Sequence, residues 1–113
     1  MKRDWEDFIK DILDEIENIL EFVEDMNYDD FFQDNKTIYA VIRSIEIMGE
    51  AVKNIPYEIQ EKYFEIPWSQ MAKMRDKLIH GYFNINHLRV WETVTNEIPP
   101  LQPLFKQIFD EYK

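Results

Sequence analysis

Apolar side chains recur every three or four positions along most of this chain, which is the period of an amphipathic α-helix. The first apolar stripe covers residues 5–23, with acidic residues between its members. A second stripe covers residues 38–55, and Pro56 is expected to stop that helix. The residues between the two stripes, 27–34, are predicted to form a turn.

The remaining half of the chain predicts further helices. Residues 56–67 are expected to form a short helical turn and a connector, followed by a third helix from Trp68 to Ile79 or His80 that Gly81 terminates. A fourth helix is predicted over residues 86–97. Three prolines then interrupt the chain before a short C-terminal helix: Pro99, Pro100 and Pro103. Short connections between these helices indicate an all-α fold, an antiparallel four- to five-helix up-and-down bundle.

Gly49 lies in the middle of the second apolar stripe, where a side chain would be expected. Glycine inside a helix costs about 1 kcal/mol relative to alanine, and it removes a side chain from the helix interface. We therefore expect another helix to approach closely at Gly49.

Composition limits the class of protein. The 113 residues suffice for one small domain over 1–113, and a hydrophobic content of 45% argues against disorder. The sequence contains no cysteine, so disulfides and thiolate metal sites or nucleophiles are excluded. No apolar run approaches the length of a transmembrane helix, and no leader segment is evident. We interpret the chain as a soluble, cytoplasmic protein that binds no membrane.

Charge is distributed unevenly. The formal net charge of −10 argues against general affinity for polyanions. Residues 1–30 carry 12 acidic and 3 basic side chains, a pattern that usually marks a solvated helix face. In contrast, residues 71–91 carry four basic side chains and one acidic side chain. This basic segment is the more informative of the two for function.

Arg75 occupies a position of the third helix that its apolar stripe would otherwise fill. A guanidinium keeps its charge and is costly to bury without a partner. It therefore requires a carboxylate, an anionic ligand or a polar interface. An ion pair with Glu46 or Glu50 of the second helix, or a side chain that extends to solvent, would explain Arg75 without any function.

His80 and Tyr82 follow Arg75 with the spacing Arg-x4-His-x-Tyr. Five residues turn a regular helix by 500°, so Arg75 and His80 would lie about 140° apart. For both groups to meet one phosphate, the chain must break near Gly81, or the groups must come from two subunits of a dimer. Taken alone, His80 also has a structural explanation, as a histidine at a helix C-terminus that interacts favourably with the helix dipole.

Three blocks of sequence resemble the HepT-like toxins of the HEPN superfamily: AVIRSIEIMGEAVK (40–53), IPWSQMAKMRDKLIHGYF (66–83) and VWETVTNEIP (90–99). The resemblance implies a HEPN-like helical domain and a metal-independent endoribonuclease that needs no cofactor. It also implies a homodimer, within a type II/VII-like toxin-antitoxin module whose antitoxin is a minimal nucleotidyltransferase. The RNA substrate would be a tRNA or an mRNA.

By the same resemblance, the motif residues are catalytic Arg75 and His80, with Tyr82 as the hydroxyl that the antitoxin adenylylates. The chemistry is consistent with these residue types, because attack by a ribose 2′-oxygen builds negative charge that an arginine can clamp. A histidine can transfer a proton near neutral pH. Tyr82 is also suited to stack on a base or to position a ribose.

Neighbouring polar residues allow more than one interpretation. Lys73 and Lys77 lie one turn apart and suit either an RNA backbone or a solvated helix face. Asp76 could either orient the His80 side chain of a neighbouring subunit or form an ion pair with a lysine. His87 is more readily explained as an incidental surface histidine than as a second catalytic one.

Two other function classes compete with the ribonuclease. One is a non-catalytic helical interaction or nucleotide-binding module that partners a nucleotidyltransferase. The other is a metal enzyme built on Glu46 and Glu50, which is the weaker hypothesis because no histidine accompanies that acid pair on its helix.

Overall fold

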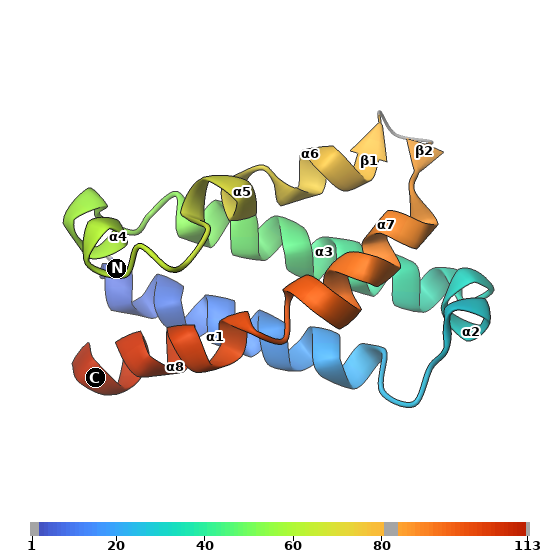
Figure 1. Ribbon diagram of the computed structural model, residues 1–113, viewed down its shortest axis with the longest axis horizontal. Helices are drawn as coiled ribbons and strands as arrows, with labels where there is room; N and C mark the ends of the chain where they lie inside the picture. The colour runs from blue at the N-terminus through green and yellow to red at the C-terminus, as the bar shows by residue number, and fades with distance from the viewer. Residues whose placement is uncertain (1–2, 81–83, 113) are drawn as a thin grey trace.

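The computed structural model describes residues 3–80 and 84–112, without the side chain of His80. Two helices of 18 residues each form the first two arms of the fold, α1 (Trp5–Phe22) and α3 (Asn35–Val52). They run antiparallel and pack along their length (Figure 1). The short helix α2 (Tyr28–Phe32) connects them.

Shorter elements build the other two arms. After the short helix α4 (Tyr57–Lys62), the third arm comprises α5 (Trp68–Ala72), α6 (Met74–Leu78) and the strand β1 (Ile79–His80). The fourth arm returns through the strand β2 (Asn84–Ile85), α7 (His87–Glu92), the π-helical turn η1 (Thr93–Glu97) and α8 (Leu101–Tyr112). The arms alternate in direction, which confirms the predicted all-α, up-and-down fold.

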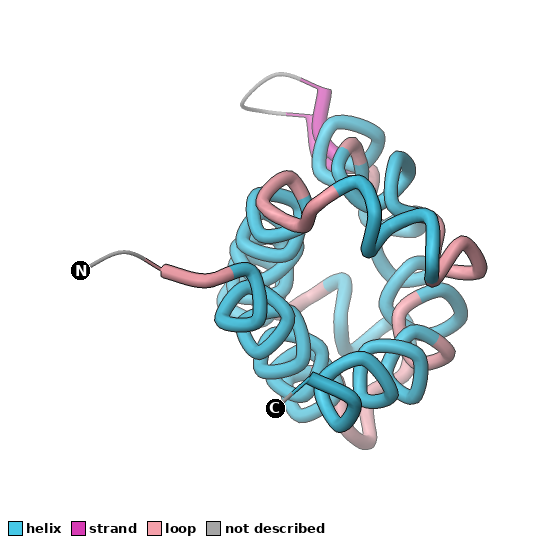
Figure 2. Tube along the Cα trace, turned by 90° about the vertical axis from the view of Figure 1, so that its left-hand side faces the viewer, coloured by secondary structure: helices cyan, strands magenta, loops and turns pink. Residues whose placement is uncertain are grey.

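Isoleucines at helical spacing form the centre of the core. Seen end-on, the helices surround a common interior (Figure 2). The stripe of α1 is fully buried at Ile9, Ile12, Ile16 and Ile19, as the periodicity predicted. Elsewhere in the core, the ring of Trp68 meets that of Phe105 edge-on, with centroids 5.5 Å apart. This contact joins the third arm to the fourth.

Several predicted boundaries are wrong. Residues 27–34 contain the helix α2 rather than only a turn, because Asn27 and Asp30 form a reciprocal capping box. The helix α3 ends at Val52, before Pro56. The helix α8 begins at Leu101 and includes Pro103 in its first turn, where a backbone N–H has no helical partner.

In the part of the chain that the structure describes, no helix combines the length and the apolar character needed to cross a membrane.

Candidate functional site

The predicted third helix is not continuous. It bends at Lys73 (φ −108°, ψ 4°), which separates α5 from α6. A Cβ atom added to Gly49 would lie 3.3 Å from the carbonyl oxygen of Met71 and 3.5 Å from that of Ala72. This confirms the expected close approach at Gly49. The arm therefore meets α3 through its backbone at the point where it bends.

The predicted extension of this helix to Ile79 or His80 is also wrong. The helix α6 ends at Leu78, and Ile79 has extended dihedral angles (φ −125°, ψ 124°). The strand β1 pairs antiparallel with β2, Ile79 opposite Ile85 and His80 opposite Asn84. The backbone thus leaves the helix before His80, so the 140° offset of a regular helix does not apply to it.

Parts of the predicted site lie outside the described residues. These are Gly81, Tyr82 and the side chain of His80, so the meeting of His80 with Arg75 remains a prediction. The predicted helix stop at Gly81 is wrong, because α6 already ends at Leu78. The described part of the motif is Arg75 with its neighbours on α6, together with the backbone of the strand that carries His80.

Arg75 is partly exposed, with 38% of its side chain accessible, and it lies between two carboxylates. Its Nε is 3.4 Å from Oε2 of Glu46 on α3, and its Nη1 is 3.5 Å from Oδ1 of Asp76. Of the two partners considered from sequence, Glu46 is the one that pairs. A guanidinium has five N–H donors, so these two long contacts leave it with donors for an anion.

Glu46 and Glu50 each contact a cation. Glu46 also lies 3.8 Å from Arg43, whereas Glu50 pairs with Lys53 at 3.1 Å. Among residues 3–80 and 84–112, no group of three or more histidine, aspartate or glutamate side chains is placed to hold a metal ion.

The other predicted site residues surround Arg75 without converging on it. Lys73 lies exposed at the bend and Lys77 lies exposed on α6. Asp76 contacts Arg75, a pairing that the sequence did not suggest. His87 packs against Phe32 with ring centroids 4.9 Å apart, so a packing role accounts for it.

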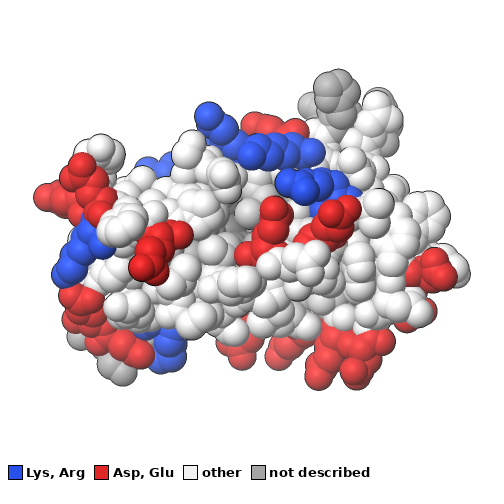
Figure 3. Space-filling view, viewed as in Figure 1, with Lys and Arg blue, Asp and Glu red and all other residues white. Residues whose placement is uncertain are grey.

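One group of basic side chains lies along one edge of the molecule. In the space-filling view they lie along the upper edge, over α5, α6 and α7, whereas acidic side chains dominate the lower edge (Figure 3). The basic residues on these elements and on the bend are Lys73, Arg75, Lys77 and Arg89. The uneven distribution of acidic and basic residues along the sequence is therefore also present on the surface.

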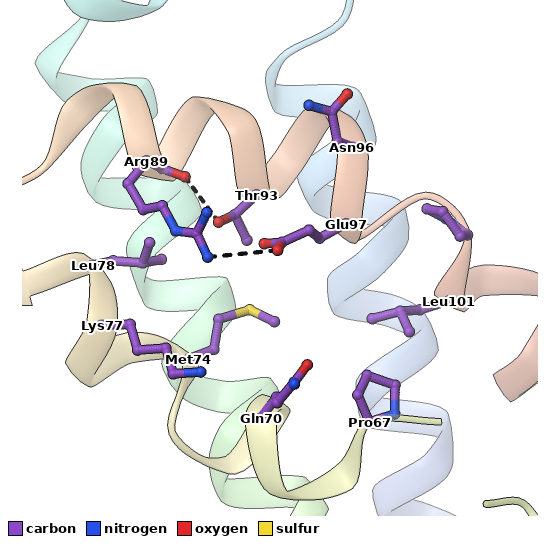
Figure 4. A pocket seen from close by; sticks show the side chains of 11 residues that line it. Pro67, Gln70, Met74, Lys77, Leu78, Arg89, Thr93, Asn96, Glu97 and Leu101 are labelled. Atoms are coloured by element: carbon purple, nitrogen blue, oxygen red, sulfur yellow. Dashed lines mark hydrogen bonds and ion pairs between the residues drawn. The ribbon is translucent and has the colours of Figure 1, made fainter. Parts of the chain in front are cut away.

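Sequence reasoning missed a groove beside this basic edge. It has a volume of about 340 Å³ and lies between α5–α6 and α7–η1 (Figure 4). Lys77 and Arg89 contribute cations to its wall, and Gln70 contributes an amide. Nothing in the sequence marks these residues as neighbours, because the groove is formed by two arms that meet only in the tertiary structure.

Comparison with known proteins identifies the family of this chain. The sequence profile of the family described as "Ribonuclease HepT-like" matches residues 12–108. A protein of Thermococcus cleftensis named "Probable ribonuclease HepT" is 47% identical over 108 residues, which cover 96% of this chain and 98% of that protein. A protein of Methanocaldococcus jannaschii named as a "Putative RNase" is 47% identical over 110 residues, 97% of this chain and 95% of that protein.

A third similar protein, from Caldanaerobacter subterraneus and also named "Putative RNase", is 44% identical over 106 residues, 94% of this chain and 95% of that protein. No solved structure matches the sequence. The helical fold, the order of the three sequence blocks and the profile match agree, and the chain belongs to the ribonuclease HepT-like family of the HEPN superfamily.

Proposed function

We propose that this protein is a metal-independent endoribonuclease toxin of a type II/VII-like toxin-antitoxin module, which cleaves a tRNA or an mRNA at a composite site of a homodimer. The observation that carries the proposal is the arrangement of the third arm. It holds a partly exposed guanidinium on α6 and then changes at Ile79 to an extended strand that carries His80. Family membership supports the ribonuclease class.

The reaction proposed for this site needs no group beyond the protein. The ribose 2′-oxygen forms a bond to the adjacent phosphorus, and the bond from phosphorus to the 5′-oxygen breaks. The 2′-hydroxyl proton passes to one His80, and a protonated His80 of the partner subunit gives a proton to the leaving oxygen. Arg75 binds the phosphate oxygens as their charge increases. The products carry a 2′,3′-cyclic phosphate and a 5′-hydroxyl.

The dimer follows from this proton balance. One step must remove a proton while another supplies one, and a single copy of the chain offers one histidine at the motif. Two-fold symmetry brings two copies of Arg75 and His80 to a shared cleft. The contacts of Arg75 with Glu46 and Asp76 are long and partly exposed, so an RNA phosphate can compete with them.

Cleavage in EDTA by purified dimer tests the proposal. Arg75→Ala is expected to lower the cleavage rate about 100-fold or more, because it removes a donor to the developing anion. His80→Ala is expected to lower it by about 10² to 10⁴-fold. His87→Ala and Arg3→Ala are matched controls that remove a histidine and an arginine elsewhere, and both should cleave normally.

Helical circular dichroism establishes that each variant is folded. Retained cleavage in folded Arg75→Ala or His80→Ala would reject the mechanism. If no RNA is cleaved by the wild-type protein while partner binding survives in His80→Ala, the chain is instead a non-catalytic interaction module.

We further propose that a minimal nucleotidyltransferase antitoxin silences the enzyme by adenylylating Tyr82. A nucleotide attached two residues after His80 would occupy the cleft and bring an anion to Arg75. Expression of the chain alone should arrest growth, and co-expression with the nucleotidyltransferase encoded beside it should restore growth. A Tyr82→Phe protein that is still silenced, or an intact protein whose Tyr82 peptide gains no adenylyl mass, would contradict this assignment.

A further inference from the structure

The groove beside α6 has the dimensions of a small-ligand site. One part of it is lined by cations and the other part by apolar and amide side chains. Its volume of about 340 Å³ lies within the range of ligand pockets. Lys77, two residues after Arg75, lines the groove, whereas Arg75 contacts α3 instead. The groove is therefore separate from the position of the Arg75 guanidinium, although the same short helix supplies both.

Two cations form one part of the groove. Lys77 extends from α6 and Arg89 from α7, on opposite walls (Figure 4). Arg89 Nη2 is 3.6 Å from Oε1 of Glu97, and the two side chains are 45% and 49% exposed. Exposed ion pairs at such a distance contribute little to stability, so an incoming phosphate can draw Arg89 away from Glu97.

The other part of the groove has apolar side chains and amides. Met74 extends between the two walls, with Pro67 and Leu101 beside it (Figure 4). A thioether is polarisable and packs well against a flat ring. The amide of Gln70 points toward Met74 and offers both a donor and an acceptor, which is what the edge of a nucleobase requires (Figure 4).

The turn η1 presents the polar side chains of one wall. The N–H of Ile98 donates to the carbonyl oxygen of Thr93 at 2.9 Å, an i to i+5 bond that widens the helix. Thr93, Asn96 and Glu97 of this turn all line the groove. Turns of this kind are rare and occur frequently at functional sites, which is independent support for a ligand here.

The groove adjoins the strand that carries His80. Lys77 precedes His80 by three residues, so their Cα atoms lie within about 11 Å of each other. The N–H of Asn86 donates to the carbonyl oxygen of Leu78 at 2.9 Å, and the Asn86 side chain caps α7. The backbone bond holds the two walls together at the hairpin end, next to the proposed scissile site.

We propose that this groove is a subsite for one nucleotide of a single-stranded RNA, with its phosphate on Lys77 and Arg89 and its base over Met74 between Gln70 and Glu97. This assignment rests on the proposed ribonuclease function and specifies how the substrate is held. The carboxylate of Glu97, released from Arg89, only accepts hydrogen bonds. The subsite therefore prefers adenine, which presents an exocyclic amine, over uracil, whose single donor, N3–H, lies between two carbonyl oxygens that a carboxylate repels.

Binding is tested separately from cleavage. The His80→Ala protein, which is not expected to cut the strand, is titrated into fluorescein-labelled oligoadenylate and oligouridylate, and the dissociation constants are measured by anisotropy. Lys77→Gln and Arg89→Gln are each expected to weaken binding about tenfold, because each loses a charge-assisted phosphate contact. Glu97→Gln should abolish the preference for oligoadenylate. Gln70→Trp should weaken binding by filling the groove at constant charge.

Lys106→Gln is the matched control. Lys106 lies on α8, pairs with Asp110 at 2.8 Å and lies outside the groove, and its loss removes the same charge. An effect of Lys106→Gln equal to those of Lys77→Gln and Arg89→Gln would overturn the subsite, as would unchanged binding by Gln70→Trp or an initial lack of preference for oligoadenylate. Absence of cleavage by the wild-type protein, with the groove variants still defective in binding, would refute the ribonuclease while retaining the nucleotide site.

Discussion

The missing side chain at Gly49 sets how closely α3 and α5 approach. The backbone carbonyls of Met71 and Ala72 lie where a side chain would begin. Position 49 was identifiable from sequence because a glycine interrupts an apolar stripe. The helix that fills the space was not, since no local pattern names a partner.

Substitution of Gly49 by valine should destabilise the protein. The Cβ atom alone would contact the Met71 carbonyl oxygen at 3.3 Å, and the two added methyl groups must push the arm away. We expect the free energy of unfolding to fall by roughly 2 kcal/mol. Urea denaturation measures it. Tyr39→Val, at a position of the same helix that is 66% exposed, should change it by no more than about 0.5 kcal/mol. Equal values for the two variants would refute the packing argument.

At the scale of elements, short side-chain signals decided where helices begin and end. Asn27 and Asp30 begin α2, a helix that the apolar period is too coarse to reveal. Asp34 begins α3, with its carboxylate accepting from the N–H of Thr37 at 3.1 Å and from the Thr37 hydroxyl at 2.8 Å. In contrast, the bend at Lys73 and the strand at Ile79 have no comparable local signal, and both were mispredicted.

The cap at Asp34 should make the stability of α3 depend on pH. The hydrogen bonds from the Thr37 backbone and hydroxyl lower the pKa of the Asp34 carboxyl below its usual value of 3.8. A lowered pKa in the folded state stabilises the protein above about pH 4, and this contribution disappears as the pH falls through the folded value. Asp34→Ala should therefore lower the melting temperature by a few degrees at pH 7, and the difference should shrink at pH 3. A difference independent of pH would contradict this role.

At the scale of the whole molecule, contacts between distant segments hold the fourth arm to the connector before the third. Lys62 Nζ is 2.6 Å from Oε1 of Glu111, across 49 residues of sequence, and 3.0 Å from the Tyr112 hydroxyl. The Tyr63 hydroxyl donates to the other oxygen of Glu111. This cluster joins α4 to the C-terminal end of α8, at the opposite end of the molecule from β1 (Figure 1), so it and the basic edge can be altered independently.

The phenol of Tyr63 should lose its proton at a higher pH than an ordinary tyrosine. Burial, followed by its hydrogen bond to Glu111, raises the pKa of the Tyr63 phenol to about 12. Because the folded value exceeds the unfolded value of about 10, this contribution to stability is complete below pH 10 and is lost as the pH rises through 12. Ultraviolet titration should show one phenolate forming near pH 12, absent in Tyr63→Phe. Glu111→Gln should shift that transition to lower pH, whereas Lys106→Gln should leave it in place.

The charge segregation also belongs to this scale. The acidic residues of segment 1–30 are carried largely by α1 and α2, away from the basic edge over α5, α6 and α7. A protein with a net charge of −10 can thus still present a basic edge to a polyanion. The net charge alone pointed to the opposite conclusion.

The sequence by itself determined the helical class, the buried stripes of α1 and α3, the close approach at Gly49 and the family. Each of these follows from the spacing of nearby residues or from contiguous blocks of sequence. Only the tertiary structure decided that Glu46 rather than Glu50 meets Arg75, that the third arm bends and becomes a strand before His80, and that Lys77 and Arg89 face one groove. Those features depend on contacts between arms, where small differences in packing energy select among arrangements that the local sequence leaves equally open.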